Sequence, residues 1–184
     1  DGDYLDNKKH NKWTYWSETG QKTEEINYDS SGVQNGAHIK WFDEKNDQHK
    51  KFHVNYKNGE KNGSWHYWYT NGIDSVQSHY ENGEKNGHWA WWRKNGLKDK
   101  EGDYKNEEKH GIWTVWNDSS GTAYHQLHRE TFVDGKIDGE VTKWYKEGKL
   151  DRQGIMRGNE KEGEWIYWER DGKRWLKFNY GDGL

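Results

Sequence analysis

The chain repeats one short segment, and this repetition constrains its fold more than any other property. Residues 56–79 read YKNGEKNGSWHYWYTNGIDSVQSH, and residues 80–103 read YENGEKNGHWAWWRKNGLKDKEGD. Each copy holds a leading tyrosine, Asn-Gly, a short charged link, a second glycine, Trp-x-x-Trp and another Asn-Gly. Self-similarity at a fixed period is the signature of a repeat array.

The leading tyrosine, replaced by phenylalanine or methionine in two copies, divides the whole chain into units. Two units have 28 residues and the other complete units have 24. The added residues lie mainly within 42–51 and 117–130, near the second turn of the unit, and we expect both insertions to protrude from the same edge. The domain predicted for 1–184 is a single array of seven units and a partial eighth: 4–27, 28–55, 56–79, 80–103, 104–131, 132–155, 156–179 and 180–184.

Each unit has the pattern of one β-hairpin. Asn-Gly pairs such as Asn58-Gly59 and Asn71-Gly72 favour the positive φ of tight hairpin turns. The segments between them are about six to eight residues long and rich in Trp, Tyr, Ile and Val, which is typical of strands. No helical apolar spacing is sustained. The predicted fold class is therefore all-β: a single-layer, elongated antiparallel sheet of stacked β-hairpins, forming a repeat solenoid.

Aromatic rings must supply most of the core. Hydrophobic residues make up only 29% of the chain and the mean hydropathy is -1.57, values that are typical of disordered segments. However, the chain has 14 Trp, 12 Tyr and 4 Phe, and each ring buries on the order of 150–250 Å². We interpret the chain as a thin folded array that is held together by rings.

The two tryptophans of each unit are three residues apart, so an unbulged strand points them to opposite faces. We predict that the second tryptophan, present in every unit, joins the leading tyrosines in the core, and that Trp68→Ala destabilises the fold more than Trp65→Ala. A bulge at the recurrent glycine would change this parity. The predicted core ladder is Trp16, Trp41, Trp68, Trp92, Trp116, Trp144 and Trp168 with Tyr28, Tyr56, Tyr80 and Tyr104. The first tryptophans (Trp13, Trp65, Trp89, Trp113 and Trp165) are predicted to be more exposed.

The unit Tyr-x-Asn-Gly-x-x-x-Gly-x-Trp-x-x-Trp-x-x-Asn-Gly resembles the MORN repeat, and most closely its bacterial variant, which also occurs in a class of antitoxins. The resemblance covers all seven units. It implies a scaffold or binding surface made of stacked hairpins, and it carries no catalytic residues. The unit length of 24 and the high tryptophan content depart from the usual repeat, which bears against the lipid binding proposed for that family. A weaker resemblance links Gly-x-Trp-x-Tyr-Trp to aromatic repeats that bind choline.

Several function classes are disfavoured by composition. The net charge is -3 with both signs interleaved, so no basic excess is available for nucleic acid. No apolar stretch is long enough for a transmembrane segment, and there is no cysteine. His125 and His128, like His49 and His53, are more simply interpreted as solvated loop residues than as a zinc site. We therefore expect no catalytic residues, no metal, no cofactor and no enzyme activity.

The predicted function is a non-enzymatic scaffold or protein-binding module that uses its sheet surface. The candidate binding surface is Trp65, Tyr67, Trp89, Trp91 and Trp113. The structural alternative is that the first tryptophans merely cover the second face of the sheet. Carbohydrate or cell-wall binding by the same rings is an alternative function, as is antitoxin-like inhibition. Both ends lack a polar cap and the chain begins at Asp1, so we also expect either an excerpt of a longer array or self-assembly with further copies. A secreted or cell-surface location is slightly favoured over a cytoplasmic one.

Overall fold

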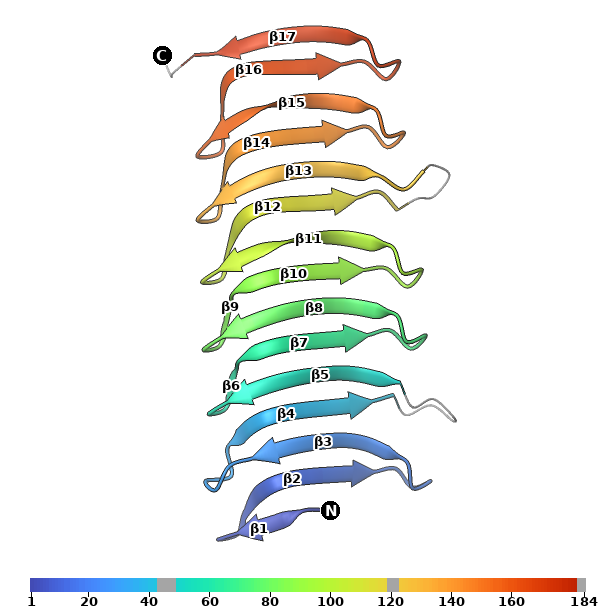
Figure 1. Cartoon of the computed structure of the whole chain (residues 1–184), viewed down its shortest axis with the longest axis vertical. Helices are drawn as coiled ribbons and strands as arrows, with labels where there is room; N and C mark the ends of the chain where they lie inside the picture. The colour runs from blue at the N-terminus through green and yellow to red at the C-terminus, as the bar shows by residue number, and fades with distance from the viewer. Residues whose placement is uncertain (43–48, 119–122, 182–184) are drawn as a thin grey trace. The chain divides into compact units, whose positions relative to one another are not determined.

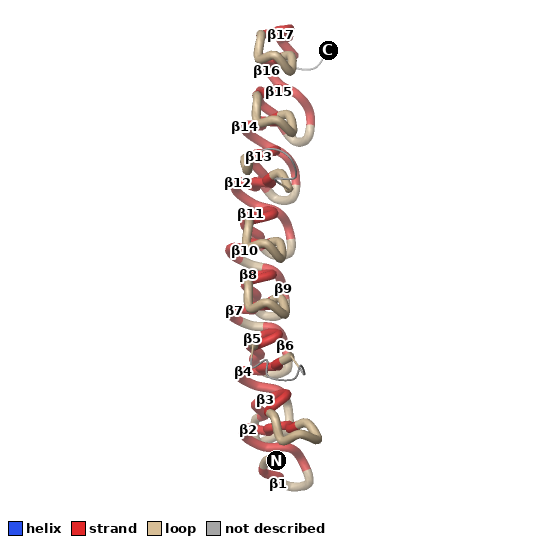
Figure 2. Tube along the Cα trace, turned by 90° about the vertical axis from the view of Figure 1, so that its right-hand side faces the viewer, coloured by secondary structure: helices blue, strands red, loops and turns tan. Residues whose placement is uncertain are grey.

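The computed structural model describes residues 1–42, 49–118 and 123–181, which form strands and turns and contain no helix. The strands pair in antiparallel hairpins that stack in a single open layer (Figures 1 and 2). The predicted fold class of stacked antiparallel hairpins is therefore confirmed. Contacts divide the chain into two compact parts, Asp1–Leu97 and Lys98–Leu184. We call these parts the first unit and the second unit, and we call the 24- and 28-residue segments repeats.

The described residues of the first unit form ten strands that pair mostly in chain order. The short strands β6 and β9 each continue into the following strand, so β5 also pairs with β7, and β8 with β10. The strands are β1 (Asp3–Leu5), β2 (Lys8–Trp16), β3 (Lys22–Tyr28), β4 (Gln34–Trp41), β5 (Lys50–Lys57), β6 (Glu60–Lys61), β7 (Gly63–Trp68), β8 (Asp74–Glu81), β9 (Glu84–Lys85) and β10 (Gly87–Trp92).

The described residues of the second unit form seven strands, each paired with its neighbour in sequence. They are β11 (Lys98–Lys105), β12 (Glu108–Trp116), β13 (Gln126–Val133), β14 (Lys136–Trp144), β15 (Leu150–Arg157), β16 (Glu160–Trp168) and β17 (Arg174–Tyr180). The predicted insertions at 42–51 and 117–130 lie partly outside the described residues, because 43–48 and 119–122 are not described.

The two turns of each repeat differ in conformation. In the first turn both central residues have positive φ, as at Asn58 (52°) and Gly59 (85°), except in repeat 28–55, where only Gly32 (79°) does; two left-handed residues make the primed turn that Asn-Gly favours. In the second turn only the glycine is left-handed, as at Gly72 (77°). The amide of Gly72 donates to the carbonyl of Tyr69 at 2.9 Å. Glycine is therefore the left-handed residue of the second turn, whereas the first turn also accepts other residues at positive φ, as at Asn106 (52°) and Glu107 (70°).

A left-handed residue also lies two positions before the first tryptophan of each repeat, or before His38 and Val141 where that tryptophan is replaced, and it produces a bulge. The residues are Asn11, Gly36, Gly63, Gly87, Gly111, Gly139 and Gly163. Between β11 and β12, Glu101 pairs with Thr114 and Asp103 with His110, so Gly102 alone faces three residues of β12. Towards the next strand, the pairing of β12 stays regular from Gly111 to Val115. Trp113 therefore keeps the same face as Gly111 and Val115.

The predicted assignment of the two tryptophan rows is wrong. The first tryptophans are the buried ones, with exposed fractions of 9% for Trp13, 5% for Trp65, 7% for Trp89, 5% for Trp113 and 2% for Trp165. The second tryptophans are only partly buried, and Trp16 is 53% exposed. We call Trp13, Trp65, Trp89, Trp113 and Trp165 the inner tryptophan row. We call Trp16, Trp41, Trp68, Trp92, Trp116, Trp144 and Trp168 the outer tryptophan row.

The register explains this reversal. In the hairpin of β7 and β8, Gly63 pairs with Tyr80, Trp65 with Ser78 and Tyr67 with Val76. Directly paired residues share a face of the sheet, so the inner row lies with the leading tyrosines. Tyr80 is buried, and Tyr28, Tyr56 and Tyr104 are partly buried. We call this side the tyrosine face.

Small residues beneath the inner row allow its indoles to lie against the backbone. A Cβ on Gly102 would lie 2.3 Å from Trp113, a Cβ on Gly154 would lie 2.3 Å from Trp165, and Gly2 stands in the same relation to Trp13. Real Cβ atoms do not come this close to other atoms, so only glycine fits beneath these three rings. These three indoles are therefore buried within a single layer, without a second sheet to cover them.

Candidate binding surface

On the tyrosine face, lysine side chains cover the inner tryptophan row. The ammonium nitrogen of Lys61 lies 5.0 Å from the ring centroid of Trp65 and 4.7 Å from that of Tyr80. Lys161 lies 4.9 Å from the Trp165 ring and donates to the hydroxyl of Tyr167 at 2.7 Å, a hydrogen bond that raises the pKa of this lysine. The lysine side chains that make these cation–π contacts thus shield the aromatic rings of the tyrosine face from solvent.

The inner indoles also donate hydrogen bonds to the neighbouring strand. In each case the acceptor is the carbonyl ten residues earlier, as from Trp65 Nε1 to Asn55 at 2.8 Å and from Trp113 Nε1 to Asp103 at 2.9 Å. Trp13, Trp89 and Trp165 donate in the same way. Each ring of this row is thus held by packing, by a cation and by a backbone hydrogen bond, which is the environment of a core residue.

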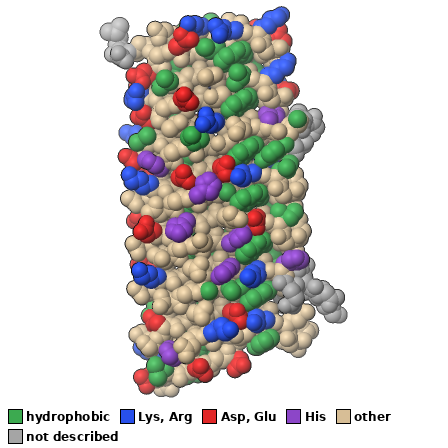
Figure 3. All heavy atoms as spheres, in the orientation of Figure 1, with side chains coloured by type: hydrophobic (Ala, Val, Ile, Leu, Met, Phe, Trp, Pro, Cys, Tyr) green, Lys and Arg blue, Asp and Glu red, His purple; other side chains and the backbone are tan. Residues whose placement is uncertain are grey.

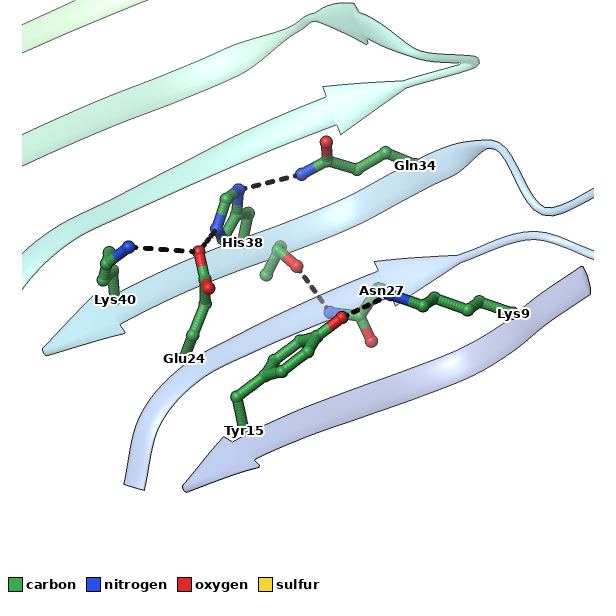
Figure 4. A network of polar contacts seen from close by, with 8 residues as sticks. Lys9, Tyr15, Glu24, Asn27, Gln34, His38 and Lys40 are labelled. Atoms are coloured by element: carbon green, nitrogen blue, oxygen red, sulfur yellow. Dashed lines mark hydrogen bonds and ion pairs between the residues drawn. The ribbon is translucent and has the colours of Figure 1, made fainter. Parts of the chain in front are cut away.

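One repeat replaces the buried indole with a polar network (Figure 4). His38 stands at the inner-row position, and its Nε2–H donates to Glu24 at 2.7 Å. Gln34 donates to His38 Nδ1 at 3.0 Å, and Lys40 lies 3.8 Å from the Glu24 carboxylate. Both ring nitrogens of the histidine are therefore satisfied within the tyrosine face. We interpret this network as a structural replacement for a tryptophan.

The binding surface predicted from the sequence does not form an exposed patch. Trp65, Trp89 and Trp113 are buried, and Tyr67 and Trp91 are partly buried beside them on the tyrosine face. The ring of Tyr67 lies 6.3 Å from that of Trp65, and Trp91 lies 5.5 Å from Trp89. Burial raises the pKa of Tyr67 to about 12. Neither alternative made from the sequence describes these residues, because the first tryptophans are buried and lie on the tyrosine face, not on the opposite one.

The opposite side of the sheet carries the outer tryptophan row and a group of histidines, and we call it the histidine face. The imidazole of His66 stacks on the indole of Trp68 with 3.8 Å between centroids, which places both residues on this face. Lys22 lies between two outer indoles, 5.8 Å from Trp16 and 5.5 Å from Trp41. The outer row is thus partly covered by side chains of its own face and remains partly open to solvent.

Histidines gather next to the outer row in the first unit, over β7, β8 and β10 (Figure 3). His53 and His66 pair directly across β5 and β7, and burial together with the charge of Lys50 lowers the pKa of His53. An open groove of about 590 Å³ crosses β7, β8 and β10. The residues of the histidine face that line it are Ser64, His66, Gln77, His79 and His88.

The carboxylate in this region is engaged by the histidine face itself. His66 Nε2–H donates to Asp74 Oδ1 at 2.7 Å, and Gln77 Nε2 donates to Asp74 Oδ2 at 3.0 Å. Among the described residues, no group of three or more His, Cys, Asp or Glu is arranged to hold a metal ion. On the histidine face, the lining of the groove thus consists of hydroxyl, amide and imidazole groups, which together offer both donors and acceptors of hydrogen bonds.

The remaining histidines named from the sequence serve the fold. His125 Nε2 contacts the carbonyl of Tyr145 at 3.1 Å, and its amide donates to the Asn117 side chain at 3.1 Å. His128 lies in β13, where burial lowers its pKa. These two histidines are therefore not loop residues that are free in solvent, as the sequence suggested.

Comparison of the chain with protein-family models and with curated protein sequences found no match. No helix within the described ranges is long and apolar enough to cross a membrane.

Proposed function

We propose that this chain is a non-enzymatic repeat scaffold that binds an extended ligand through its histidine face. The observation that supports the proposal most directly is the contrast between the two tryptophan rows. The inner row is buried and fully engaged. The outer row recurs once per hairpin at the surface, where large, partly exposed aromatic rings are typical of binding sites.

The groove supports the same surface. It crosses the strands β7, β8 and β10, and the outer row passes through two of these strands at Trp68 and Trp92. Indoles and the polar groove therefore run in the same direction across the sheet. A ligand lying across the strands would contact rings along one side and hydrogen-bonding groups along the other.

The test uses a triple variant in which Trp41, Trp68 and Trp92 are replaced by glutamine. The wild-type chain and the variant are screened against a glycan array and a phage-displayed peptide library. We expect at least one ligand that binds the wild type and is lost in the variant, while circular dichroism shows retained strand content. Trp175→Gln, a change at a 65% exposed tryptophan outside the outer row, is the control and should bind normally.

Two results would contradict the proposal. One is that no ligand in either collection depends on the outer row. The other is that ligands bind the wild type and the triple variant equally well. If the triple variant unfolds, the single variant Trp92→Gln replaces it with the same criteria.

A further inference from the structure

We infer that the ligand of the outer tryptophan row in the first unit is a linear, uncharged β-1,4-linked glycan in its extended form. This inference rests on the proposed function and adds the chemical class of the ligand. It concerns Trp41, Trp68 and Trp92, together with the groove that crosses β7, β8 and β10.

The spacing of the indoles is the first reason. They recur once per hairpin, so successive rings are separated by two strand spacings, about 9.4–9.8 Å. A ligand that meets every ring in the same way must repeat at this distance. In an extended β-1,4-linked glycan each sugar is turned over relative to the last, and the repeating disaccharide has a length close to two strand spacings. An extended peptide strand repeats every two residues, about 6.6–6.8 Å, and does not match.

The second reason is that the indole rings and the polar groups of the groove match the two kinds of surface that a sugar presents. The faces of β-linked pyranose rings that carry axial C–H groups are apolar and flat, and they complement indole rings. Sugar hydroxyls both donate and accept hydrogen bonds. Ser64, Gln77 and the neutral forms of His79 and His88 have the same dual capacity. A polyproline helix also repeats at about 9.3 Å, but its backbone offers acceptors almost alone, which uses this mixed set of groups poorly.

Charge supports an uncharged glycan. The Asp74 carboxylate already accepts hydrogen bonds from His66 and Gln77. The ammonium nitrogen of Lys22 forms an ion pair with the Glu25 carboxylate at 2.7 Å. The groove itself is lined by serine, glutamine and histidine. It therefore presents no concentration of one charge sign that would select an anionic or a cationic polymer.

Isothermal titration calorimetry with oligosaccharides of defined length tests the inference. The probes are cello- and chito-oligosaccharides of two, four and six sugars, with maltohexaose, whose α-1,4 linkage curves the chain, and nonaproline as comparisons. We expect affinity to rise about tenfold for each added disaccharide, because each engages one more indole. Trp92→Gln should abolish the gain from four to six sugars, and Trp175→Gln should not.

Several outcomes would overturn the inference. Absence of binding to the β-1,4-linked hexasaccharides is one, and equal binding of maltohexaose is another. Binding of nonaproline in their place would assign the surface to a proline-rich peptide. In that case the proposed function stands and only the glycan class fails. If neither the glycan array nor the peptide library yields a ligand that depends on the outer row, the proposed function and the glycan class both fail.

Discussion

The ammonium nitrogen of Lys109 lies 4.5 Å from the ring centroid of Trp113, four residues further along β12. The same pair recurs wherever the inner row holds a tryptophan: Lys9 and Trp13, Lys61 and Trp65, Lys85 and Trp89, Lys161 and Trp165. Where the indole is absent, the lysine is absent too. Gln34 precedes His38, and Ile137 precedes the buried Val141. The two positions change together within this one chain, as expected if the cation and the ring form one interaction.

A double-mutant cycle on Lys109 and Trp113 should therefore show coupling. With Lys109→Met and Trp113→Leu, we expect about 1 kcal/mol of interaction free energy, since a partly buried cation–π contact is worth about 0.5–2 kcal/mol. Urea denaturation measures each variant. The matched cycle with Lys173→Met, an 85% exposed lysine side chain, should give no coupling with Trp113. Coupling of equal size in both cycles would show that the Lys109 contact contributes nothing specific.

Removing an inner indole should cost far more stability than removing an outer one. We expect Trp65→Ala to lower the free energy of unfolding by about 3–5 kcal/mol, because the ring is 5% exposed and donates to Asn55. Trp68→Ala should cost less than about 2 kcal/mol, because that ring is only partly buried and loses less apolar burial. Chemical denaturation of both variants checks this order. A larger loss for Trp68→Ala would restore the order predicted from the sequence.

Adding a single methyl group at Gly102 should also destabilise the fold. The new Cβ would lie 2.3 Å from Trp113, and a rigid ring cannot yield as the end of a flexible side chain does. We expect Gly102→Ala to cost about 1–3 kcal/mol through overpacking. Gly181→Ala is the control, since no atom lies within 4 Å of its added Cβ. A neutral Gly102→Ala would show that the indole does not lie against this strand.

We expect the free energy of unfolding to fall at alkaline pH because the phenol of Tyr67 is buried. Burial, with smaller contributions from Tyr80 and Tyr56, raises its pKa from 10.0 to about 12 in the folded chain. Between these two values the unfolded chain ionises and the folded chain does not, so stability contributed by Tyr67 is present below pH 10 and is lost as the pH rises towards 12. In Tyr67→Phe this part of the loss should disappear. Thermal melts from pH 8 to pH 12 compare the two, and identical pH dependence would argue against a buried phenol.

The hairpins could be predicted from the sequence, whereas the buried side of the sheet could not. Asn58-Gly59 and its equivalents define the turns locally, so their left-handed conformation follows from the residues themselves. The parity of Trp65 and Trp68 separates the two rows but does not say which one meets Tyr80. Presence in every repeat suggested the second tryptophan. The informative residues were the small ones opposite the first, such as Gly102 and Gly154.

The histidine groove has no signature in the repeat pattern. His66, His79 and His88 occupy different positions of their repeats and come together only because β7, β8 and β10 are adjacent in the sheet. A binding site formed by such irregular substitutions requires the strand register, which depends on the bulges. A consensus made by aligning the repeats does not show these histidines, because each of them occurs at a different position of its repeat.

Hydroxyl-radical footprinting read by mass spectrometry tests the central claim most directly, because it measures the solvent access of each tryptophan in the native chain. We predict that Trp16, Trp41, Trp68 and Trp92 are oxidised several times faster than Trp13, Trp65 and Trp89, following their exposure. Faster oxidation of Trp13, Trp65 and Trp89 would contradict the account, because the surface proposed to bind a ligand would then be the core.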